Sequence, residues 1–313
     1  MPYKVFVDGE SGATGLELRA RLEKRPGLTL LHIAPEKRRD PQARRSLYAQ
    51  ADLVFLCLPD DAAREAASLA EGTGARLIDA STAHRVAPGW VYGFPELAPG
   101  QREKIASAAR VAVPGCHATG FTSLMHPLVA GGILPRDYPL CCTSVSGYSG
   151  GGKKLIETYE ARRYGDPALQ SPRFYALGLA HKHLPEMQAV NGLAFPPVFT
   201  PMVGPYYRGM LVSVPLRAPL LAKPLDARGL WEYYGEYYSG EEYVRVMPFG
   251  GENALDEGFL DATGCNGTNR LDLFVFGGGE QALVVARLDN LGKGASGAAV
   301  QCMDLMAVGN VRK

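Results

Sequence analysis

The feature of this sequence that most constrains its fold is a glycine-rich turn close to its start. The apolar segment Tyr3–Asp8 runs directly into Gly9-Glu10-Ser11-Gly12-Ala13-Thr14-Gly15, and helical spacing follows over residues 16–22. Glycines at such a place permit a tight strand-to-helix turn and let the backbone approach a pyrophosphate, which binds the N–H groups of the helix N-terminus. The residues expected to bind a dinucleotide cofactor here are Gly9, Ser11, Gly12, Ala13, Thr14 and Gly15.

The rest of the first half continues this alternation of strand and helix. Further strands are expected over residues 28–34, 53–58, 76–80 and 110–113, and an Ala-rich helix over 61–70. Strands separated by helices of this length are typical of a parallel, doubly wound sheet, and near-continuous apolar strands suit a sheet buried on both faces. The predicted fold class is α/β, with a Rossmann-type sheet.

The pattern changes after about residue 118. Apolar residues from Phe121 to Val129 have helical spacing, so a helix is expected directly behind Cys116, with a kink at Pro127. Longer strands over 140–145 and 210–217, and a hairpin of 272–276 with 281–289, then predict a mixed sheet. The second half is therefore expected to form an α+β domain.

The length of 313 residues also fits two domains, at about 150 residues each. We expect a cofactor-binding domain over residues 1–117, completed by the C-terminal helix of residues 295–313. A domain for substrate binding, catalysis and oligomerisation is expected over 118–294. Hydrophobic residues make up 46% and charged residues 21%, a balance that excludes disorder and coiled coil.

The charge balance and the cysteines exclude several other classes. Lys and Arg total 33 against 32 Asp and Glu, so no nucleic-acid partner is expected. No apolar run is long enough for a membrane span, and the first strand starts too near Met1 to leave room for a signal peptide, so we expect a cytoplasmic protein. The 6 cysteines form no CxxC pair, which argues against a disulfide framework and a metal site.

The residues behind the second strand distinguish between cofactors. An NAD site typically has an Asp or Glu there, which forms hydrogen bonds with the ribose hydroxyls. In this chain the strand is followed by Lys37-Arg38-Arg39. A basic cluster suits a 2′-phosphate, so NADP is expected. Leu58-Pro59 closes the third strand, where loops at the carboxyl ends of strands line the cofactor crevice.

Cys116 is the candidate nucleophile. It lies in Val113-Pro114-Gly115-Cys116-His117, at the junction of an expected strand and an expected helix. The dipole and the N–H groups of a helix N-terminus stabilise a thiolate, and a thiolate attacks an activated acyl carbon. We therefore expect Cys116 to form a covalent intermediate.

Two histidines of the second domain are candidates for the acid or base. His181 and His183 are two residues apart, so both face the same side if the segment is extended. Histidine titrates near neutrality and can take the thiol proton or protonate an aldehyde oxygen. A zinc pair is the rival interpretation, although no third ligand is evident.

Five segments in order now show a resemblance to the N-acetyl-gamma-glutamyl-phosphate reductases of arginine biosynthesis, in their shorter variant. It spans essentially the whole chain. The segments are Gly12-Ala13-Thr14-Gly15, Tyr92-Gly93-Phe94-Pro95-Glu96, Pro114-Gly115-Cys116, His181-Lys182-His183-Leu184-Pro185-Glu186 and Asn290-Leu291-Gly292-Lys293-Gly294-Ala295. The family is related to aspartate-semialdehyde dehydrogenase and shares its general scheme with glyceraldehyde-3-phosphate dehydrogenase.

The resemblance implies that Cys116 attacks an acyl phosphate, expels phosphate and forms a thioester, which NADPH then reduces to an aldehyde. It gives the acid/base role to the segment of His181 and His183, with a preference for His183. Asn290 and Gly294 would lie by the nicotinamide, and Glu186 would contact the substrate. Longer members commonly have an aromatic residue behind the cysteine, where this chain has His117.

A small-molecule substrate with an acyl phosphate and a carboxylate requires cationic and polar groups. Ser81, Thr82 and Arg85 follow the fourth strand and offer hydroxyls and a guanidinium. The segment of residues 146–154 offers backbone N–H groups together with Ser149, Lys153 and Lys154 as an anion nest. Arg208 is a further candidate, and a homo-oligomer, either dimer or tetramer, is expected.

Other functions stay open at this point. The same chemistry would serve an aminoadipyl-phosphate or aspartyl-phosphate reductase. A cysteine hydrolase or acyltransferase would use the nucleophile but not the glycine turn. A non-catalytic NADP-sensing protein would use the glycine turn but not Cys116.

Overall fold

The computed structural model describes residues 3–162 and 164–307, and the chain divides into two compact units. The first unit contains the chain up to Pro95, Pro99–Pro114 and the segment from Ala295, and the second contains Glu96–Ala98 and Gly115–Gly294. The boundary between Pro114 and Gly115 lies three residues before the expected boundary between residues 117 and 118. The reason is that helix α5 (Cys116–Ala130) packs on the sheet of the second unit. Residues 308–313 of the expected C-terminal helix lie outside the described residues.

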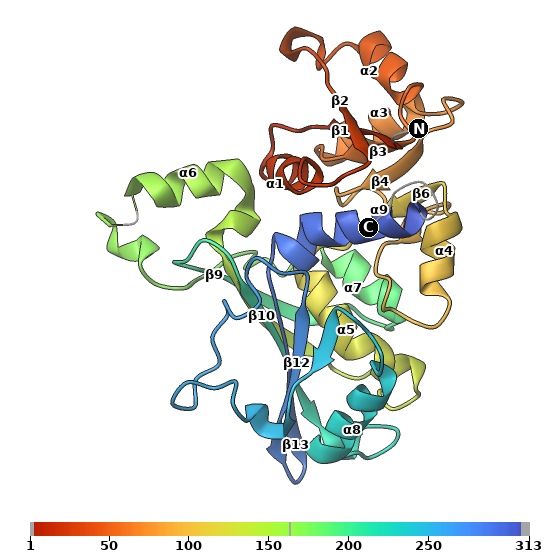
Figure 1. Ribbon diagram of the computed structural model, residues 1–313. Coiled ribbons are helices and arrows are strands. Elements are labelled where there is room, and N and C mark those ends of the chain that lie inside the picture. The colour runs from red at the N-terminus through yellow and green to blue at the C-terminus, as the bar shows by residue number, and fades with distance from the viewer. Residues whose placement is uncertain (1–2, 163, 308–313) are drawn as a thin grey trace. The chain divides into compact units, whose positions relative to one another are not determined.

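A parallel sheet of six strands forms the first unit (Figure 1). The order is β2-β1-β3-β4-β6-β5, and every adjacent pair is parallel. Its strands are β1 (Tyr3–Asp8), β2 (Leu28–Leu31), β3 (Leu53–Leu56), β4 (Arg76–Asp79), β5 (Val91–Tyr92) and β6 (Arg110–Ala112). The predicted Rossmann-type α/β fold is thereby confirmed.

Helices cover both faces of this sheet. Tyr3, Val5 and Val7 of β1 point to one face, where they pack in a core with residues of three helices, whereas Phe6 points to a second core that contains Tyr48. The helices of the first core are α1 (Ala13–Leu22), α4 (Gln101–Ser107) and α9 (Gly297–Met306), and those of the second are α2 (Pro41–Tyr48) and α3 (Asp60–Leu69). Alternation of side chains along one strand thus fills two hydrophobic layers.

Helix α2 was not predicted, although the sequence carries a signal for it. Asp40 is its N-cap, and the carboxylate accepts hydrogen bonds from the backbone N–H groups of Gln42 and Ala43. Pro41 occupies the first helical position, where a missing N–H costs nothing. The second strand also ends earlier than predicted, at Leu31, because a short 3-10 turn begins at Pro35.

A mixed sheet of seven strands forms the second unit. The order is β11-β12-β13-β10-β7-β9-β8, and the predicted hairpin of β12 with β13 is confirmed. The strands are β7 (Cys141–Gly147), β8 (Arg173–Phe174), β9 (Val198–Gly204), β10 (Met210–Arg217), β11 (Val244–Val246), β12 (Leu271–Gly278) and β13 (Gln281–Leu288). The hairpin turn needs glycine because Gly277 and Gly279 have φ of 115° and 58°.

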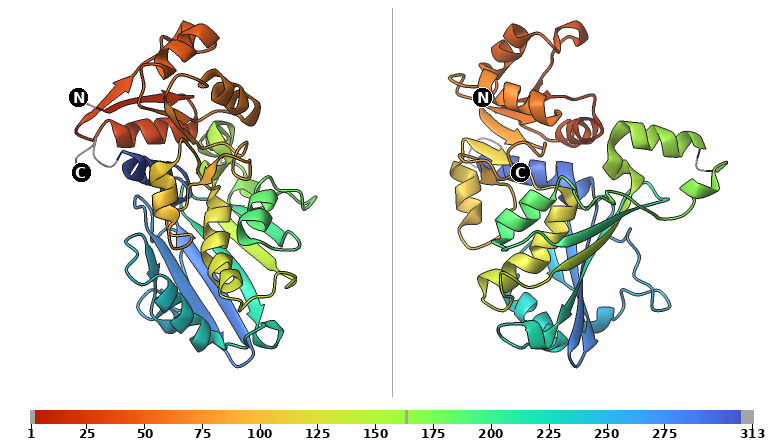
Figure 2. Two further views of the ribbon diagram at one scale, coloured as in Figure 1. Left: turned by 90° about the vertical axis from the view of Figure 1, so that its right-hand side faces the viewer. Right: turned by 180° about the vertical axis from the view of Figure 1, so that it is seen from behind.

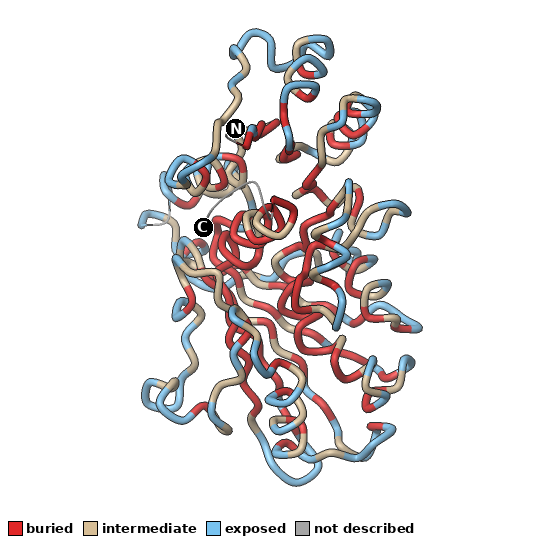
Figure 3. The backbone as a smooth tube through the Cα atoms, turned by 45° about the vertical axis from the view of Figure 1, so that its right-hand side comes forward, coloured by how far each residue is buried: buried red, intermediate tan, exposed pale blue. Residues whose placement is uncertain are grey.

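Three helices lie together along one side of this mixed sheet, namely α5, α7 (Leu184–Asn191) and α8 (Ala227–Tyr237) (Figures 1 and 2). A fourth, α6 (Gly152–Arg162), follows β7. Exposed residues gather in the connecting loops, and buried residues in the strands and in α5 (Figure 3). Among residues 3–162 and 164–307, no helix is both long and apolar enough to cross a membrane.

Tyrosines of α8 and its C-cap complete the hydrogen bonding of α5. Pro127 lacks the N–H that would bond to the Ser123 carbonyl, and the hydroxyl of Tyr238 donates to that carbonyl instead, at 2.8 Å. The hydroxyl of Tyr234 donates to the Leu124 carbonyl at 2.6 Å. Both tyrosines are buried, so this Tyr-rich segment belongs to the core.

Candidate active site

Cys116 is the first residue of α5. Its N-cap, Gly115, is extended, with φ −74° and ψ 148°, and the Gly115 carbonyl accepts a hydrogen bond from the backbone N–H of Thr119 at 2.8 Å. The sulfur therefore belongs to the end of the helix where N–H groups and the helix dipole favour a negative charge. The sequence predicted this position.

Other cysteines of the chain are less suited to be nucleophiles. Burial raises the pKa of Cys57 to about 12 and, as the largest cause, that of Cys265 to about 11. Burial also raises the pKa of Cys142 far above its ordinary value. These three side chains are thiols at neutral pH and pack as small apolar groups.

A buried carboxylate fixes the turn in front of Cys116. Glu186, in the first turn of α7, is 2% exposed and accepts a hydrogen bond from the backbone N–H of Gly115 at 2.9 Å. The sequence suggested Glu186 as a substrate contact. In the structure its carboxylate positions the backbone that carries the nucleophile.

A glycine turn on the other side also lies against Cys116. The residues 292–296 form a single π-helical turn, and a Cβ atom on Gly294 would lie 2.7 Å from the Cβ of Cys116. Only glycine allows this approach. The sequence suggested Gly294 as a cofactor contact, and the observed reason for a glycine here is the nucleophile itself.

An ion pair without solvent contact holds this turn. The Nζ of Lys293 lies 2.7 Å from Oε2 of Glu96, and both side chains are 0% exposed. The ammonium also lies 5.5 Å from the centre of the Tyr243 ring. Buried charges persist only when they are paired, so this lysine and this glutamate fix each other in place.

The side chain of Asn290 joins the turn to the loop behind β7. Its Oδ1 accepts a hydrogen bond from the Gly209 N–H at 2.8 Å, and its Nδ2 donates to Oγ of Ser149 at 2.9 Å. Asn290 and Ser149 are each 2% exposed. Two predicted site residues, one assigned to cofactor and one to substrate, are thus brought together.

The predicted lysines lie elsewhere on that loop. Residues 148–151 form a 3-10 turn and α6 begins at Gly152, so the segment is ordered. Lys153 and Lys154 are on the exposed surface of α6, and Lys153 lies 3.9 Å from Glu157. Arg208 is more enclosed, and its guanidinium lies 3.4 Å from Asp289.

Both predicted histidines gather around the residue that follows Cys116. The rings of His181 and His183 lie 5.4 Å and 5.5 Å from the ring of His117, and 4.7 Å from each other. The segment is a turn into α7 rather than an extended strand, and the backbone N–H of His183 donates to Nδ1 of His181 at 3.1 Å. The prediction that the two side chains share one site agrees with these distances.

His117 itself joins two hydroxyl groups that the sequence did not single out. Its Nδ1 lies 2.9 Å from Oγ of Ser144, and its Nε2 lies 2.8 Å from Oη of Tyr175. Burial, with smaller contributions from His181 and Lys182, lowers the pKa of His117 to about 3. Its imidazole is therefore neutral at physiological pH.

In the first unit, the glycine turn has the close packing that excludes side chains. Gly9 has φ 89°, and a Cβ atom on it would lie 2.3 Å from the Cys57 carbonyl oxygen and 3.1 Å from Leu58. A Cβ on Gly15 would lie 2.4 Å from the Gly9 carbonyl oxygen. The ends of β1 and β3 thus meet the start of α1, as a dinucleotide cradle requires. Pro59, which was also predicted here, is the N-cap of α3.

The predicted basic cluster reaches this glycine turn through Arg38. Its guanidinium lies 2.6 Å from Oε1 of Glu10, a residue of the turn, while Arg19 lies 3.1 Å from Oε2 of the same carboxylate. Lys37 and Arg39 are exposed beside it. The cation proposed for the 2′-phosphate therefore lies next to the proposed pyrophosphate site.

The polar residues that follow β4 in the sequence form hydrogen bonds within the first unit. Ser81 donates to Asp79, with its Oγ 2.7 Å from the carboxylate, and Thr82 donates to Asp60. Arg85 donates through Nε to the Val113 carbonyl at 2.9 Å. These bonds hold the loop that was predicted to contact substrate.

No group of three or more His, Cys, Asp or Glu that could hold a metal ion occurs within the described part of the chain. The site consists of a thiol, three imidazoles and buried backbone donors. This chemistry suits nucleophilic attack with proton transfer.

Two family models match the chain in succession. One, described as "Semialdehyde dehydrogenase, NAD binding domain", matches residues 4–108, and the other, "Semialdehyde dehydrogenase, dimerisation domain", matches residues 116–290. The chain is 50% identical over 309 residues to N-acetyl-gamma-glutamyl-phosphate reductase 2 of Nostoc sp., covering 97% of this chain and 96% of that one. It is 47% identical over 309 residues to N-acetyl-gamma-glutamyl-phosphate reductase of Brucella ovis, covering 98% and 99%.

Solved structures show the same fold at low sequence identity. Aspartate semialdehyde dehydrogenase II of Vibrio cholerae has a TM-score of 0.72 at 18% identity, over 99% of both chains. Aspartate semialdehyde dehydrogenase with NADP from Candida albicans has a TM-score of 0.67 at 12% identity, over 98% of this chain and 99% of that one. At these identities the likeness concerns the fold alone.

Because His117 is buried, we expect the free energy of unfolding to fall in acid. The unfolded chain takes up a proton at this side chain near its ordinary pKa of 6.5, whereas the folded chain does so only near 3. The contribution of His117 to stability is therefore fully present above pH 6.5 and is lost as the pH falls toward 3, by about 1.4 kcal/mol per pH unit. In His117→Gln, urea unfolding at pH 7.5 and pH 4.5 should show a smaller difference in free energy than in the wild type.

The matched control is His32→Gln, because His32 is exposed. This variant should keep the acid sensitivity of the wild type. Equal acid sensitivity of the wild type and His117→Gln would show that His117 is not held neutral by the fold.

Proposed function

The chain belongs to the N-acetyl-gamma-glutamyl-phosphate reductase family, within the semialdehyde dehydrogenases, and on this premise we propose how its residues carry the reaction. The protein is an oxidoreductase of arginine biosynthesis that uses NADPH to reduce N-acetyl-gamma-glutamyl phosphate to N-acetyl-glutamate semialdehyde. The observation that supports the residue assignment best is Cys116 at the start of α5, with both candidate histidines around the next side chain.

The first unit is proposed to bind the cofactor. The residues fit NADP, because Gly9 and Gly15 leave room that a side chain would fill and Arg38 adjoins the glycine turn. When bound, NADPH supplies the hydride that reduces the acyl group. The turn of residues 9–15 would hold the pyrophosphate, and Lys37, Arg38 and Arg39 the 2′-phosphate.

The second unit is proposed to carry the covalent chemistry. The thiolate of Cys116 attacks the acyl carbon of the substrate, the bond to the phosphate oxygen breaks, and phosphate leaves as a thioester forms. The buried Gly115–Glu186 bond and the Gly294 turn hold the sulfur in place for this attack. Pre-orientation of this kind lowers the barrier without new contacts to the substrate.

The two histidines receive different proposed roles. His181 accepts the His183 N–H at its Nδ1, so the neutral ring carries its proton on Nε2 and is a donor. His183 is then the base that accepts the proton of the Cys116 thiol. This division is consistent with the preference for His183 that the family resemblance implied.

Cationic side chains are proposed to bind the anions of the substrate. Arg85 is fixed by the Val113 carbonyl, three residues before Cys116 in the chain, and is the candidate for the phosphate. Ser81 and Thr82 support the loop that carries it. Lys153, Lys154 and Arg208 are the candidates for the carboxylate. A cytoplasmic location belongs to this proposal, since the enzyme draws on NADPH for amino-acid biosynthesis.

The proposed reaction is tested in reverse. With N-acetyl-glutamate semialdehyde, phosphate and NADP, the protein should form NADPH only when phosphate is present, as followed by absorbance. Cys116→Ser should abolish this turnover and change the NADP affinity by less than about threefold, because the thiol belongs to the reaction and not to the cofactor cradle.

Cys141→Ser is the matched control, because Cys141 is an exposed thiol at the start of β7. It should retain activity. Turnover by Cys116→Ser would contradict the thioester mechanism. Turnover only with aspartate semialdehyde or the aminoadipate analogue would keep the mechanism and change the substrate, and NADP binding without any turnover would favour a cofactor-sensing protein.

The preference for NADP is tested by charge reversal. Arg38→Glu with Arg39→Glu should weaken NADP binding at least about tenfold, because charge-assisted hydrogen bonds to the 2′-phosphate are lost. Binding of NAD, measured by calorimetry in parallel, should change much less. Arg45→Glu, an exposed charge reversal on α2, is the control, and an equal loss for both cofactors would place the 2′-phosphate elsewhere.

We also propose a homodimer through the side of the mixed sheet that lacks helices α5, α7 and α8. Side chains alternate between the two sides of the sheet along β7, β9 and β10. On this side, the positions that are exposed at least in part carry no charge over most of the length of these strands. They are Cys141, Thr143, Val145, Val198, Thr200, Met202, Leu211, Ser213 and Pro215. An uncharged face of this extent suits a second copy of the chain, in line with the name of the matched dimerisation domain.

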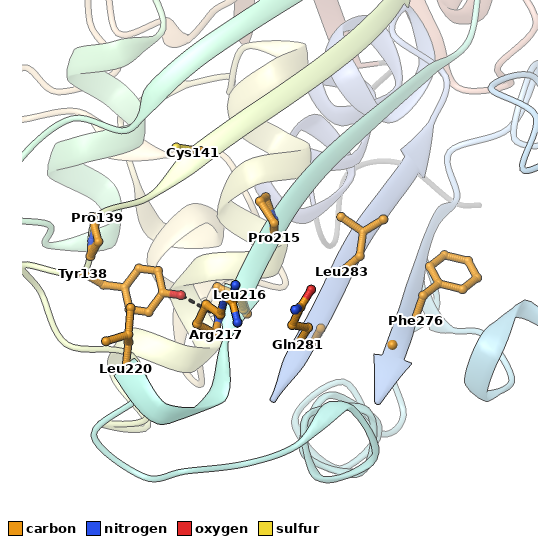
Figure 4. Close-up of a pocket in the computed structure, with 12 residues that line it drawn as sticks. Tyr138, Pro139, Cys141, Pro215, Leu216, Arg217, Leu220, Phe276, Gln281 and Leu283 are labelled. Atoms are coloured by element: carbon orange, nitrogen blue, oxygen red, sulfur yellow. Dashed lines mark hydrogen bonds between the residues drawn. The ribbon is translucent and has the colours of Figure 1, made fainter. Parts of the chain in front are cut away.

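An apolar pocket adds to this face at one end (Figure 4). It has a volume of about 550 Å³ and is lined by residues that include Cys141, Pro215, Phe276 and Leu283. Leu211→Glu with Met202→Glu should convert the dimer to a monomer in sedimentation equilibrium, because each charge would be buried unpaired. Ala49→Glu, on the exposed surface of the first unit, should not, and an unchanged dimer in the double variant would place the interface elsewhere.

A further inference from the structure

The mechanism so far leaves three bonded side chains without a role. His117, directly behind Cys116, lies between Ser144 of β7 and Tyr175 of the loop behind β8, at 2.9 Å and 2.8 Å. His117 is 3% exposed and Ser144 is 1% exposed. Polar groups as deeply buried as His117 and Ser144 are costly unless their hydrogen bonds are complete, so the arrangement of the row is well defined.

Neutrality of the central ring limits the row to two arrangements. A neutral imidazole donates from one nitrogen and accepts at the other. In the first arrangement, Ser144 donates to Nδ1 and Nε2–H donates to the Tyr175 oxygen. In the second, Tyr175 donates to Nε2 and Nδ1–H donates to Ser144. Only the first leaves the phenolic hydrogen of Tyr175 for another acceptor.

Tyr175 is hydrogen-bonded to the residue that follows the nucleophile, and it keeps its proton. Its hydroxyl lies 2.8 Å from Nε2 of His117, directly after Cys116 in the chain. Burial raises the pKa of Tyr175 above its ordinary value of 10, and the negative charge of Cys116 raises it further. Its ring centre lies 5.8 Å from that of His181, and its backbone N–H donates to the Pro201 carbonyl at 3.1 Å. The phenol is therefore a neutral group beside His117 and His181.

The loop that contains Tyr175 has a strained backbone of the kind often found at functional sites. Ala176 has φ 52° and Leu179 has φ 53°, a left-handed conformation that residues with side chains rarely adopt. Such strain persists where surrounding contacts over-determine the backbone. The bonds of Tyr175 to His117 and to Pro201 are such contacts, and they fix the phenol although 36% of the residue is exposed.

We propose that Tyr175 donates a hydrogen bond to the acyl oxygen of the substrate, and that Ser144 and His117 are positioning residues that orient this donor. The inference rests on the proposed function, because it assigns a donor to the reaction of Cys116. The negative charge that develops on the acyl oxygen during attack is stabilised by a donor held in advance. His117 thus serves as a neutral spacer whose protonated nitrogen is set by Ser144, and no proton leaves it.

Nitrogen NMR tests the arrangement without relying on activity. In the ¹⁵N-labelled wild type, the His117 ring, assigned by its loss in His117→Gln, should show an unprotonated Nδ1 and a protonated Nε2. The opposite tautomer would overturn the proposal. In that case the hydroxyl of Tyr175 would donate its hydrogen bond to Nε2 of His117 and could not donate to the substrate.

Kinetics tests the donor. Tyr175→Phe should lower kcat about 100-fold with KM changed by less than about threefold, because the lost bond forms in the transition state. His117→Leu should lower kcat similarly, whereas His117→Gln, whose amide N–H can replace Nε2–H, should restore most of it. The double variant His117→Leu/Tyr175→Phe should be no slower than Tyr175→Phe alone, since both changes remove one interaction.

Tyr164→Phe is the matched control, because Tyr164 is 81% exposed in the same unit. Thermal melting and alkylation of Cys116 show that each variant folds and keeps its nucleophile. A wild-type kcat in Tyr175→Phe would overturn the donor role, and additive losses in the double variant would overturn the role of His117. Lack of turnover by the wild type with every semialdehyde would instead contradict the proposed function.

Discussion

The buried ion pair of Lys293 and Glu96 is the interaction on which the site depends. Neither side chain touches solvent, so loss of one partner would leave an uncompensated charge in the core, at a cost of about 3–5 kcal/mol. The lysine lies in the turn whose Gly294 packs against Cys116, and the glutamate lies in the short segment 96–98 that belongs to the second unit. Tyr237 adds to this anchor by donating to the Leu97 carbonyl at 2.5 Å. A charged pair thus holds the turn that packs against the nucleophile, because neither charge is compensated without the other.

Burial decides the chemistry of the histidines around that backbone. A histidine at the surface titrates near neutrality, but His117 lies under Phe199 and beside two other imidazoles, so its protonated form is disfavoured. A neutral ring can set the direction of a hydrogen bond, whereas a charged ring only donates. The fold therefore gives the three histidines different surroundings, and the roles proposed for them differ accordingly.

The first unit uses carboxylates at strand ends to hold its loops. Asp8 at the end of β1 pairs with Arg44 at 2.9 Å and accepts from Tyr48, which fixes α2 on the sheet. Asp79 at the end of β4 bonds to Ser81 and His84. Because these carboxylates engage the neighbouring polar side chains, the loops at the carboxyl ends of the strands keep a defined shape around the glycine turn. Glu10 extends the pattern to Arg38, the cation assigned to the 2′-phosphate.

The sequence alone determined what local rules encode. Strand β1, the hairpin of β12 with β13, and the start of α5 at Cys116 follow from apolar periodicity and from glycine at positions of positive φ or close approach. The resemblance in five segments indicated the reaction, and the family comparisons agree with it. Helix α2 was missed although Asp40-Pro41 signals its start, because its amphipathic pattern is short and polar.

The tertiary structure alone decided that Tyr175 meets His117, 58 positions apart, and that Ser144 lies at the other nitrogen, 27 positions away. It also decided that Glu186 serves the backbone of Gly115. Contacts across such separations depend on how strands and helices pack, and no local spacing records them.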